Sequence, residues 1–129
     1  MQSGTELTAT EIKLRTRSRL LEVAFGDGSR FELPFEYLRV YSPSAEVRGH
    51  GGEPTLVAGK ENVGVQGIEP IGHYAVRLLF DDGHNTGLYT WKYLYELGVQ
   101  RAAYWSDYLA RLERAGQSRQ SVERRDPPR

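Results

Sequence analysis

The stretch Leu21-Glu22-Val23-Ala24-Phe25 leads into Asp27-Gly28 and then into Phe35-Glu36-Tyr37-Leu38. The same phrase returns as Val76-Arg77-Leu78-Leu79-Phe80, followed by Asp82-Gly83 and Trp91-Lys92-Tyr93-Leu94. In each copy the apolar run is typical of a strand, and the Asp-Gly pair favours a hairpin turn. The aromatic phrase that closes each copy predicts a short helix. We therefore expect an α+β fold, in which two β-hairpin-plus-helix units form a small, mostly antiparallel sheet with helices packed on it.

Two further strands are expected outside the repeat. Alternation of apolar and polar residues predicts a strand over 12–17. The apolar residues of 63–71 are interrupted at Gly67 and Pro70, which predicts a strand at a sheet edge or with a bulge.

The helices and the boundaries follow from local signals. Pro34 is expected to open a helix over 34–40, and Gly98 to end one over 91–97. An apolar stripe of helical period predicts a third helix over 101–115. An irregular connection is expected over 44–62. The expected organisation is a flexible N-terminus at 1–7, a domain at 8–98, a C-terminal helix at 99–116 and a disordered tail at 117–129.

The composition excludes several classes of function. Lys plus Arg equal Asp plus Glu at 17 each among 129 residues, so the chain lacks the basic excess typical of nucleic-acid-binding proteins. The absence of cysteine excludes disulfides, thiolate zinc sites and iron–sulfur clusters held by the chain's own cysteines. No apolar run approaches the roughly 20 residues that span a bilayer, and the first residues lack a signal-peptide pattern. We expect a cytoplasmic protein without nucleic-acid or membrane partners.

The three histidines are the candidates for metal chemistry. His84 with His50, His73 or Asp82 could bind zinc or iron if the loops that carry these residues converge. Their spacing matches no established ligand motif, and the interpretation as solvated turn and loop residues is favoured.

Aromatic and arginine side chains near the turns favour a binding surface over an active site. No catalytic signature is present, because Pro54 and Glu61 break the P-loop pattern around Gly59-Lys60 and no nucleophile elbow occurs. A small enzyme is therefore the least favoured function. We expect a non-catalytic protein-interaction module without a cofactor. Its expected contact patch is Arg39, Arg48, His50, His84, Tyr89 and Trp91.

Three phrases in order resemble a known family: residues 33–39 (LPFEYLR), residues 42–51 (SPSAEVRGHG) and residues 72–91, which run from Gly72-His73-Tyr74 through Asp82-Gly83-His84 to Thr90-Trp91. Over about 8–98 the chain is similar to the bacterial family of small proteins that resemble the N-terminal domain of gamma-butyrobetaine hydroxylase. The resemblance implies an α+β domain that, in the hydroxylases, precedes an iron- and 2-oxoglutarate-dependent catalytic barrel. This chain has neither room for that barrel nor an H-x-D phrase, so hydroxylase activity is not expected.

The resemblance also implies where a metal and a partner would be sought. In the hydroxylases three cysteines and one histidine hold zinc, and these ligands align with Ser42, Ser44, Val47 and His84 of this sequence. The three cysteine positions thus carry other residues, and His84 keeps its type. Related domains are also fused to Mrp-type iron–sulfur carrier ATPases. That fusion implies an accessory role in iron–sulfur or metal metabolism, exerted through a protein partner.

Overall fold

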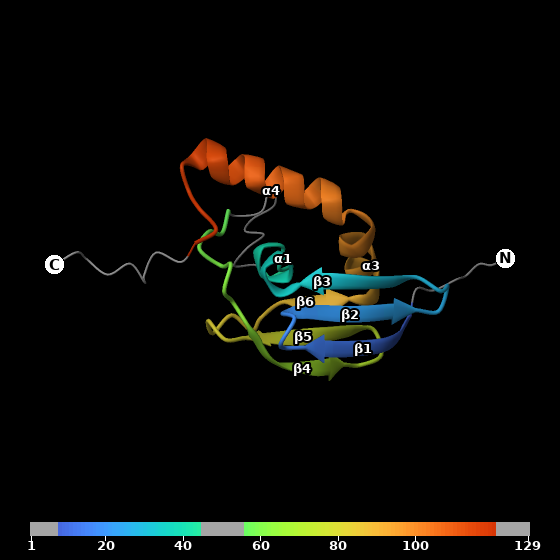
Figure 1. The fold of residues 1–129 in the computed structure, drawn as a ribbon. Coiled ribbons are helices and arrows are strands. Elements are labelled where there is room, and N and C mark those ends of the chain that lie inside the picture. Colours follow the sequence, from blue (N-terminus) through green and yellow to red (C-terminus); the bar gives the residue numbers. More distant parts are fainter. Residues whose placement is uncertain (1–7, 45–55, 121–129) are drawn as a thin grey trace.

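The computed structural model describes residues 8–44 and 56–120, which form two sheets covered by helices (Figure 1). The first unit contains β1 (Ala9–Arg15), β2 (Leu20–Phe25), β3 (Arg30–Pro34) and α1 (Phe35–Val40). The second unit contains β4 (Val65–Ile71), β5 (Ala75–Phe80), β6 (Leu88–Thr90) and α3 (Trp91–Val99), and α4 (Arg101–Ala115) follows it. The α+β class expected from the sequence is confirmed.

The strands are divided between two antiparallel three-stranded sheets, in the orders β1-β2-β3 and β4-β5-β6. Each copy of the repeat pairs with the strand that precedes it in sequence. In the part of the chain that the structure describes, no strand of one sheet pairs with a strand of the other. The strand expected over 63–71 lies at the edge of the second sheet. Its register shifts between Val65 and Gly67, so both the edge position and the bulge are confirmed.

The two copies of the repeat turn in the same way. Gly28 and Gly83 have φ values of 92° and 90°, which explains the glycine in each Asp-Gly pair. In the first copy the Asp27 carboxylate accepts a hydrogen bond from the amide two residues later. In the second copy Asp82 does the same for the amide of His84, at 3.1 Å. The prediction of two equivalent hairpin turns is therefore confirmed at the level of single hydrogen bonds.

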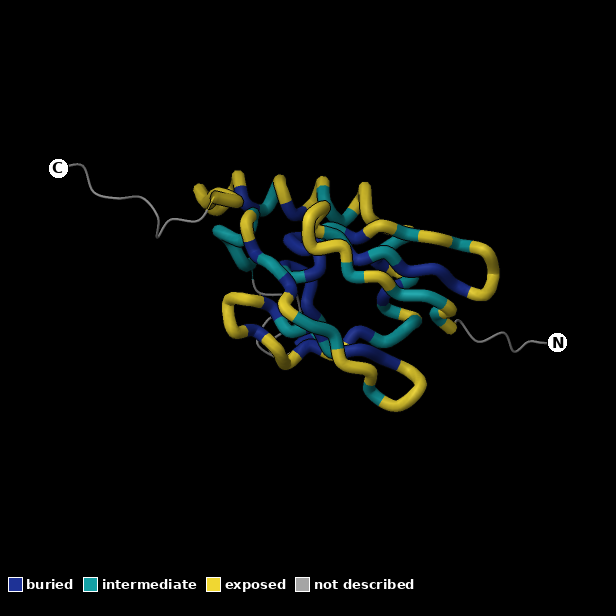
Figure 2. Tube along the Cα trace, turned by 60° about the horizontal axis from the view of Figure 1, so that its bottom comes forward, coloured by how far each residue is buried: buried dark blue, intermediate teal, exposed yellow. Residues whose placement is uncertain are grey.

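One hydrophobic core unites the two sheets and the helices (Figure 2). It contains the inward residues of both copies, such as Leu21 and Val23 of β2 and Leu78 of β5, none of them more than 1% exposed. Hydrogen bonds from buried tyrosine hydroxyls to backbone carbonyls connect the helices to this core. Tyr37 on α1 donates to the carbonyl of Leu97 at 2.7 Å, and Tyr89 on β6 donates to the carbonyl of Leu38 at 2.6 Å. Burial raises the pKa of both phenols.

The helix ends differ from the local expectations at two glycines and one proline. Pro34 lies outside α1, at its N-cap, with extended backbone. Gly98 does not end α3 but lies within it. The glycine is explained by packing, since a Cβ at this position would overlap the ring of Phe31. Gly116 supplies the left-handed cap instead, at φ 68°, and ends α4. None of the helices in the described part of the chain is long and apolar enough to cross a membrane.

The segment after α4 is held against the domain as far as the structure describes it. Ser118 accepts a hydrogen bond from the amide of Gly59 at 2.9 Å, and Arg119 accepts one from the amide of Glu61 at 3.0 Å. The sequence assigns 117–129 to a disordered tail; of that range the structure describes 117–120, where Ser118 and Arg119 make these contacts. The predictions for 1–7, for most of the 44–62 connection and for 121–129 lie outside the described residues.

Candidate functional site

Ser42, Ser44 and His84 form a buried group that we name the imidazole–hydroxyl cluster. Nε2 of His84 lies 2.8 Å from Oγ of Ser42 and 3.3 Å from Oγ of Ser44. The amide of Ser44 donates to Ser42 Oγ at 3.3 Å. Gly87 closes the group, since a Cβ there would overlap Ser42 Oγ. The cluster joins the segment after α1 to the connection between β5 and β6, so it links the two copies of the repeat.

Asp82 is an ion-pair anchor beside this cluster. Its Oδ2 accepts hydrogen bonds from Arg39 Nε at 2.8 Å and from Lys60 Nζ at 2.7 Å. Burial alone raises the pKa of Asp82, but the hydrogen bonds from Lys60, the His84 amide and Arg39 outweigh it and lower the pKa to about 2. The guanidinium of Arg39 also lies 6.0 Å from the ring centre of Phe80. Both oxygens of the Asp82 carboxylate therefore accept hydrogen bonds, Oδ2 from the two cations and Oδ1 from the backbone amide of His84.

His73, a predicted metal partner that the structure describes, is not brought to the imidazole of His84. His73 precedes β5 and His84 follows it, so the whole strand separates them. The carbonyl of His73 accepts a hydrogen bond from Trp91 Nε1 at 2.8 Å. His50 lies outside the described residues. Within 8–44 and 56–120, no three His, Asp or Glu side chains are grouped so that they could hold a metal ion.

The family's zinc ligand positions can be tested against this geometry. Ser42, Ser44 and His84, which the resemblance aligns with three of the ligands, do converge, while Val47 lies outside the described residues. The donor set is two neutral hydroxyls and one imidazole nitrogen, and that nitrogen is already in hydrogen-bond contact with both hydroxyls. Zinc in such a site is held by thiolates, whose charge hydroxyls do not supply. The residues present do not fit zinc.

The members of the predicted contact patch that the structure describes do not share one exposed surface. Tyr89 and His84 are buried, at 0% and 6% exposure, because the phenol donates into the core and the imidazole enters the cluster. The side chain of Arg39 is 11% exposed and paired with Asp82. Trp91 lies at the opposite end of β5 from His84, against His73. Arg48 and His50 lie outside the described residues.

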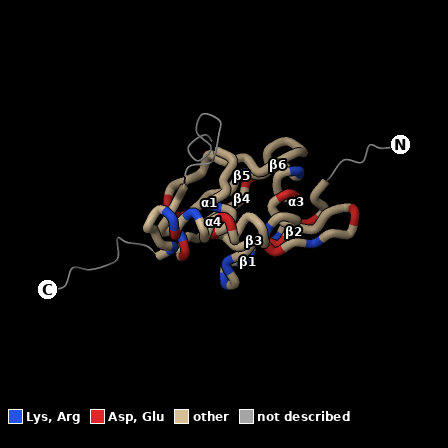
Figure 3. Tube along the Cα trace, turned by 90° about the horizontal axis from the view of Figure 1, so that it is seen from above, with Lys and Arg blue, Asp and Glu red and all other residues tan. Residues whose placement is uncertain are grey.

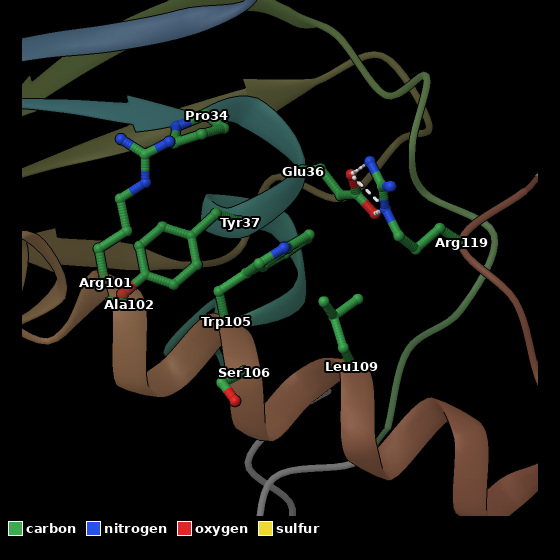
Figure 4. A pocket seen from close by; sticks show the side chains of 9 residues that line it. All are labelled: Pro34, Glu36, Tyr37, Arg101, Ala102, Trp105, Ser106, Leu109 and Arg119. Atoms are coloured by element: carbon green, nitrogen blue, oxygen red, sulfur yellow. Dashed lines mark hydrogen bonds and ion pairs between the residues drawn. The ribbon is translucent and has the colours of Figure 1, made fainter.

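A groove of about 500 Å³ lies between α1 and α4 (Figure 4). Its floor is aromatic: the Trp105 and Tyr37 rings meet edge to face, with centres 6.2 Å apart. Leu109, 40% exposed, continues the apolar lining along α4. We name this feature the α1–α4 groove, and the residues that line it are Pro34, Glu36, Tyr37, Arg101, Ala102, Trp105, Ser106, Leu109 and Arg119.

An ion pair closes one end of the α1–α4 groove. Arg119 donates to the Glu36 carboxylate through Nη2 at 2.8 Å and through Nε at 2.9 Å, a two-pronged contact. The Glu36 side chain is 8% exposed and that of Arg119 is 44% exposed. The Arg119 guanidinium also lies 5.5 Å from the ring centre of Trp105. The segment after α4 thus forms a wall of the groove.

A second hollow, of about 330 Å³, adjoins the other end and shares Arg101 with the groove. Arg30, Phe31, Glu32, Leu33 and Gly98 complete its lining, so it lies along β3, the edge strand of the first sheet. We name it the β3 hollow. Arg101 donates to the Glu32 carbonyl at 2.8 Å. Seen from above, basic and acidic residues are interspersed and not sorted into one patch (Figure 3).

Neither hollow was predicted from the sequence. The apolar stripe expected over 101–115 does lie on a helix, α4, which carries Trp105 and Leu109. Periodicity shows that two residues share a face, but not whether another element covers that face. The signal that could have located the groove is the density of aromatic residues over 91–108 together with Arg101, which begins α4.

Comparison with known proteins places these features in a family. The model of the family described as gamma-butyrobetaine hydroxylase-like, N-terminal, matches residues 12–95, well over half of the chain. Two structures solved by NMR are 50% identical to this chain, with TM-scores of 0.78 and 0.80. The match to the first structure covers 89% of this chain and 91% of that chain. The match to the second covers 94% of this chain and 91% of that chain.

A crystal structure of a protein of unknown function from Acidithiobacillus ferrooxidans, described as a member of the DUF971 family, is also similar. It is 45% identical, has a TM-score of 0.60, and the match covers 70% of this chain and 92% of that one. Among curated proteins none shows a significant similarity to this chain.

Proposed function

This chain belongs to the family of gamma-butyrobetaine hydroxylase-like N-terminal domains, and from that premise we propose that it is a non-catalytic module that binds a partner protein in the α1–α4 groove. The observation that carries the proposal is the groove itself, with its floor of Trp105 and Tyr37 and an arginine at each end. Aromatic residues and arginines are the types enriched at the centres of protein interfaces. Leu109, exposed beside them, extends the apolar area that a partner would bury.

The placement of His84 supports the non-catalytic part of the proposal. A general base must lie within hydrogen-bond reach of the proton that it takes from a substrate. The His84 side chain is 6% exposed, and its Nε2 faces the hydroxyls of Ser42 and Ser44 inside the protein. A substrate could reach this nitrogen only after the cluster had opened.

The family resemblance supports a further part of the proposal, an accessory role in iron–sulfur or metal metabolism. The chain contains no cysteine, so in that setting it would act on a partner and not as a ligand of a cluster. Binding of zinc or iron by the chain itself, the alternative function, gains no support from the contacts of His84, Asp82 and His73 described above.

Site-specific crosslinking in the native host tests the proposal. A benzophenone amino acid replaces Leu109 in the groove and, as the matched control, Tyr74, which is 54% exposed on the hairpin between β4 and β5. We expect a discrete crosslinked species, identified by mass spectrometry, from position 109 and not from position 74. Recovery of a component of iron–sulfur assembly would support the accessory role. Equal crosslinking at both positions, or at neither, would contradict a dedicated partner site in the groove.

A further inference from the structure

A guanidinium of the chain itself occupies one end of the α1–α4 groove. Nη2 and Nε of Arg119 lie 2.8 and 2.9 Å from oxygens of the Glu36 carboxylate, and the guanidinium lies 5.5 Å from the ring centre of Trp105. Figure 4 shows Arg119 facing Glu36 across this end of the groove. A planar guanidinium suits a carboxylate beside an aromatic face better than an ammonium does, because it can make two parallel hydrogen bonds and also stack.

The backbone of the same segment is held as the backbone of a peptide ligand would be. The carbonyl of Ser118 accepts a hydrogen bond from the amide of Gly59 at 2.9 Å, and the carbonyl of Arg119 accepts one from the amide of Glu61 at 3.0 Å. In peptide recognition, main-chain hydrogen bonds give affinity and a side chain in a pocket gives specificity. Ser118 and Arg119 together make both kinds of contact within one chain.

This segment is separable from the rest of the domain. Residues 113–120 are all exposed, and none of 117–120 belongs to the hydrophobic core. Gly116 ends α4 before the segment begins. Segments with few buried apolar contacts open at a lower free energy than the core does. Detachment of 117–120 would therefore leave the core and the helices in place.

Detachment would, however, leave Glu36 without a cation. The Glu36 side chain is 8% exposed, and in the described part of the chain Arg119 is the one basic residue paired with it. Arg101, the other arginine of the groove, donates to the carbonyl of Glu32 at the opposite end. A buried carboxylate is costly unless it is paired, so an open groove requires a replacement cation at Glu36.

We propose, resting on the function proposed above, that Ser118 and Arg119 are an internal ligand of the α1–α4 groove, and that the partner displaces them by placing an arginine of its own on Glu36 and Trp105. The exchange keeps one guanidinium on the carboxylate before and after binding. The free chain is autoinhibited, because the affinity for the partner is reduced by the fraction of chains in which the segment is detached. The partner segment that fits this site carries an exposed arginine.

An NMR titration of the full chain with a capped peptide of residues 116–120, Gly-Gln-Ser-Arg-Gln, tests the guanidinium site. The signals to follow are the indole N–H of Trp105 and the amides of Gly59 and Glu61. Arg119→Ala should bind the peptide at least about tenfold more tightly than the unmodified chain, because the internal ligand is gone. Arg114→Ala, an equal change at an exposed residue outside the lining, should stay within about twofold of the unmodified chain.

Two comparisons decide the outcome of the titration. A peptide with the neutral isostere citrulline in place of arginine should bind Arg119→Ala at least about tenfold more weakly. Equal binding of the two peptides would overturn the inference, and so would a folded Arg119→Ala chain whose signals do not move at roughly 10 mM arginine peptide. If the alanine variant does not fold, Arg119→Gln, which keeps a polar side chain, takes its place under the same criteria.

Crosslinking from position 109 in the native host separates this inference from the proposed function. Arg119→Ala should raise the amount of captured partner per folded chain by about threefold or more. Ser42→Ala, a change in the buried cluster outside the groove, is the control for lost stability and should not raise it. An equal or lower capture by Arg119→Ala would overturn the inference and leave the proposed function standing. Absence of any crosslink from position 109 in all three chains would overturn both.

Discussion

Replacing Arg119 with alanine removes the three hydrogen bonds from its guanidinium to Glu36 and leaves the carboxylate on α1 without its cation. Breaking a fully buried ion pair destabilises a protein by about 3–5 kcal/mol, because an uncompensated charge remains inside. Here the Glu36 side chain is 8% exposed but that of Arg119 is 44% exposed, so water can enter the space that the guanidinium leaves and partly solvate the Glu36 carboxylate. We therefore expect Arg119→Ala to lower the free energy of unfolding by about 1.5–3 kcal/mol.

The assay is denaturation by urea, with the midpoint compared at constant slope. Arg114→Ala is the matched control, because Arg114 is exposed on the last turn of α4 and should change stability by less than about 0.5 kcal/mol. The double variant Glu36→Gln with Arg119→Ala should be more stable than Arg119→Ala alone, since it removes the stranded charge. An Arg119→Ala variant indistinguishable from the control would refute the reasoning. It would mean that the segment after α4 is not held to α1 by this pair.

Three further predictions concern the turns and the helix packing. Gly98→Ala should destabilise by about 1–3 kcal/mol, although alanine is the better helix former, because the new Cβ meets the ring of Phe31; an unchanged or raised Tm would contradict this packing. The pKa of Asp82 is about 2 in the folded protein, below the value of about 3.9 for an unfolded aspartate. The stability that Asp82 contributes is therefore fully present above pH ~4 and is lost as the pH falls through about 2. Asp82→Asn should therefore lower the free energy of unfolding by about 2 kcal/mol at pH 7. The difference in this free energy between the variant and the unmodified chain should shrink toward pH 2, and a difference that stays constant with pH would argue against the ion pairs. Ser42→Ala should lower the free energy of unfolding by about 1–2 kcal/mol, because it removes a buried hydroxyl 2.8 Å from His84 Nε2. Urea denaturation of this variant beside Ser18→Ala, the same change at an exposed position, checks it.

Features that depend on adjacent residues could be predicted from the sequence. The two Asp-Gly turns are local, since the aspartate accepts from an amide two residues later and the glycine supplies the positive φ. The strand with Gly67 and Pro70 likewise carries its own evidence for an edge and a bulge. These features required no knowledge of what packs against them.

Features that depend on distant residues could not be predicted in this way. Gly98 resembles a helix cap in the sequence, and the reason for the glycine is a ring on β3 far away in the chain. Tyr89 was expected at the surface because an aromatic residue is equally suited to a core and an interface. The α1–α4 groove joins residues of 34–37 to residues of 101–119, so no window of sequence contains it. The meeting of Ser42 and Ser44 with His84 was indicated by the family resemblance, not by spacing.

The short helix α1 connects the α1–α4 groove to the region of the imidazole–hydroxyl cluster. Glu36 and Tyr37 line the groove, while the carbonyl of Leu38 accepts the Tyr89 hydroxyl and Arg39 pairs with Asp82 beside the cluster. A helix of six residues has little stability of its own, so these contacts fix its position. A groove wall held in this way loses little conformational freedom when a ligand binds, and more of the contact energy is then available as affinity. The buried polar residues of the repeat thus fix the position of α1, which forms one side of the groove proposed to bind a partner.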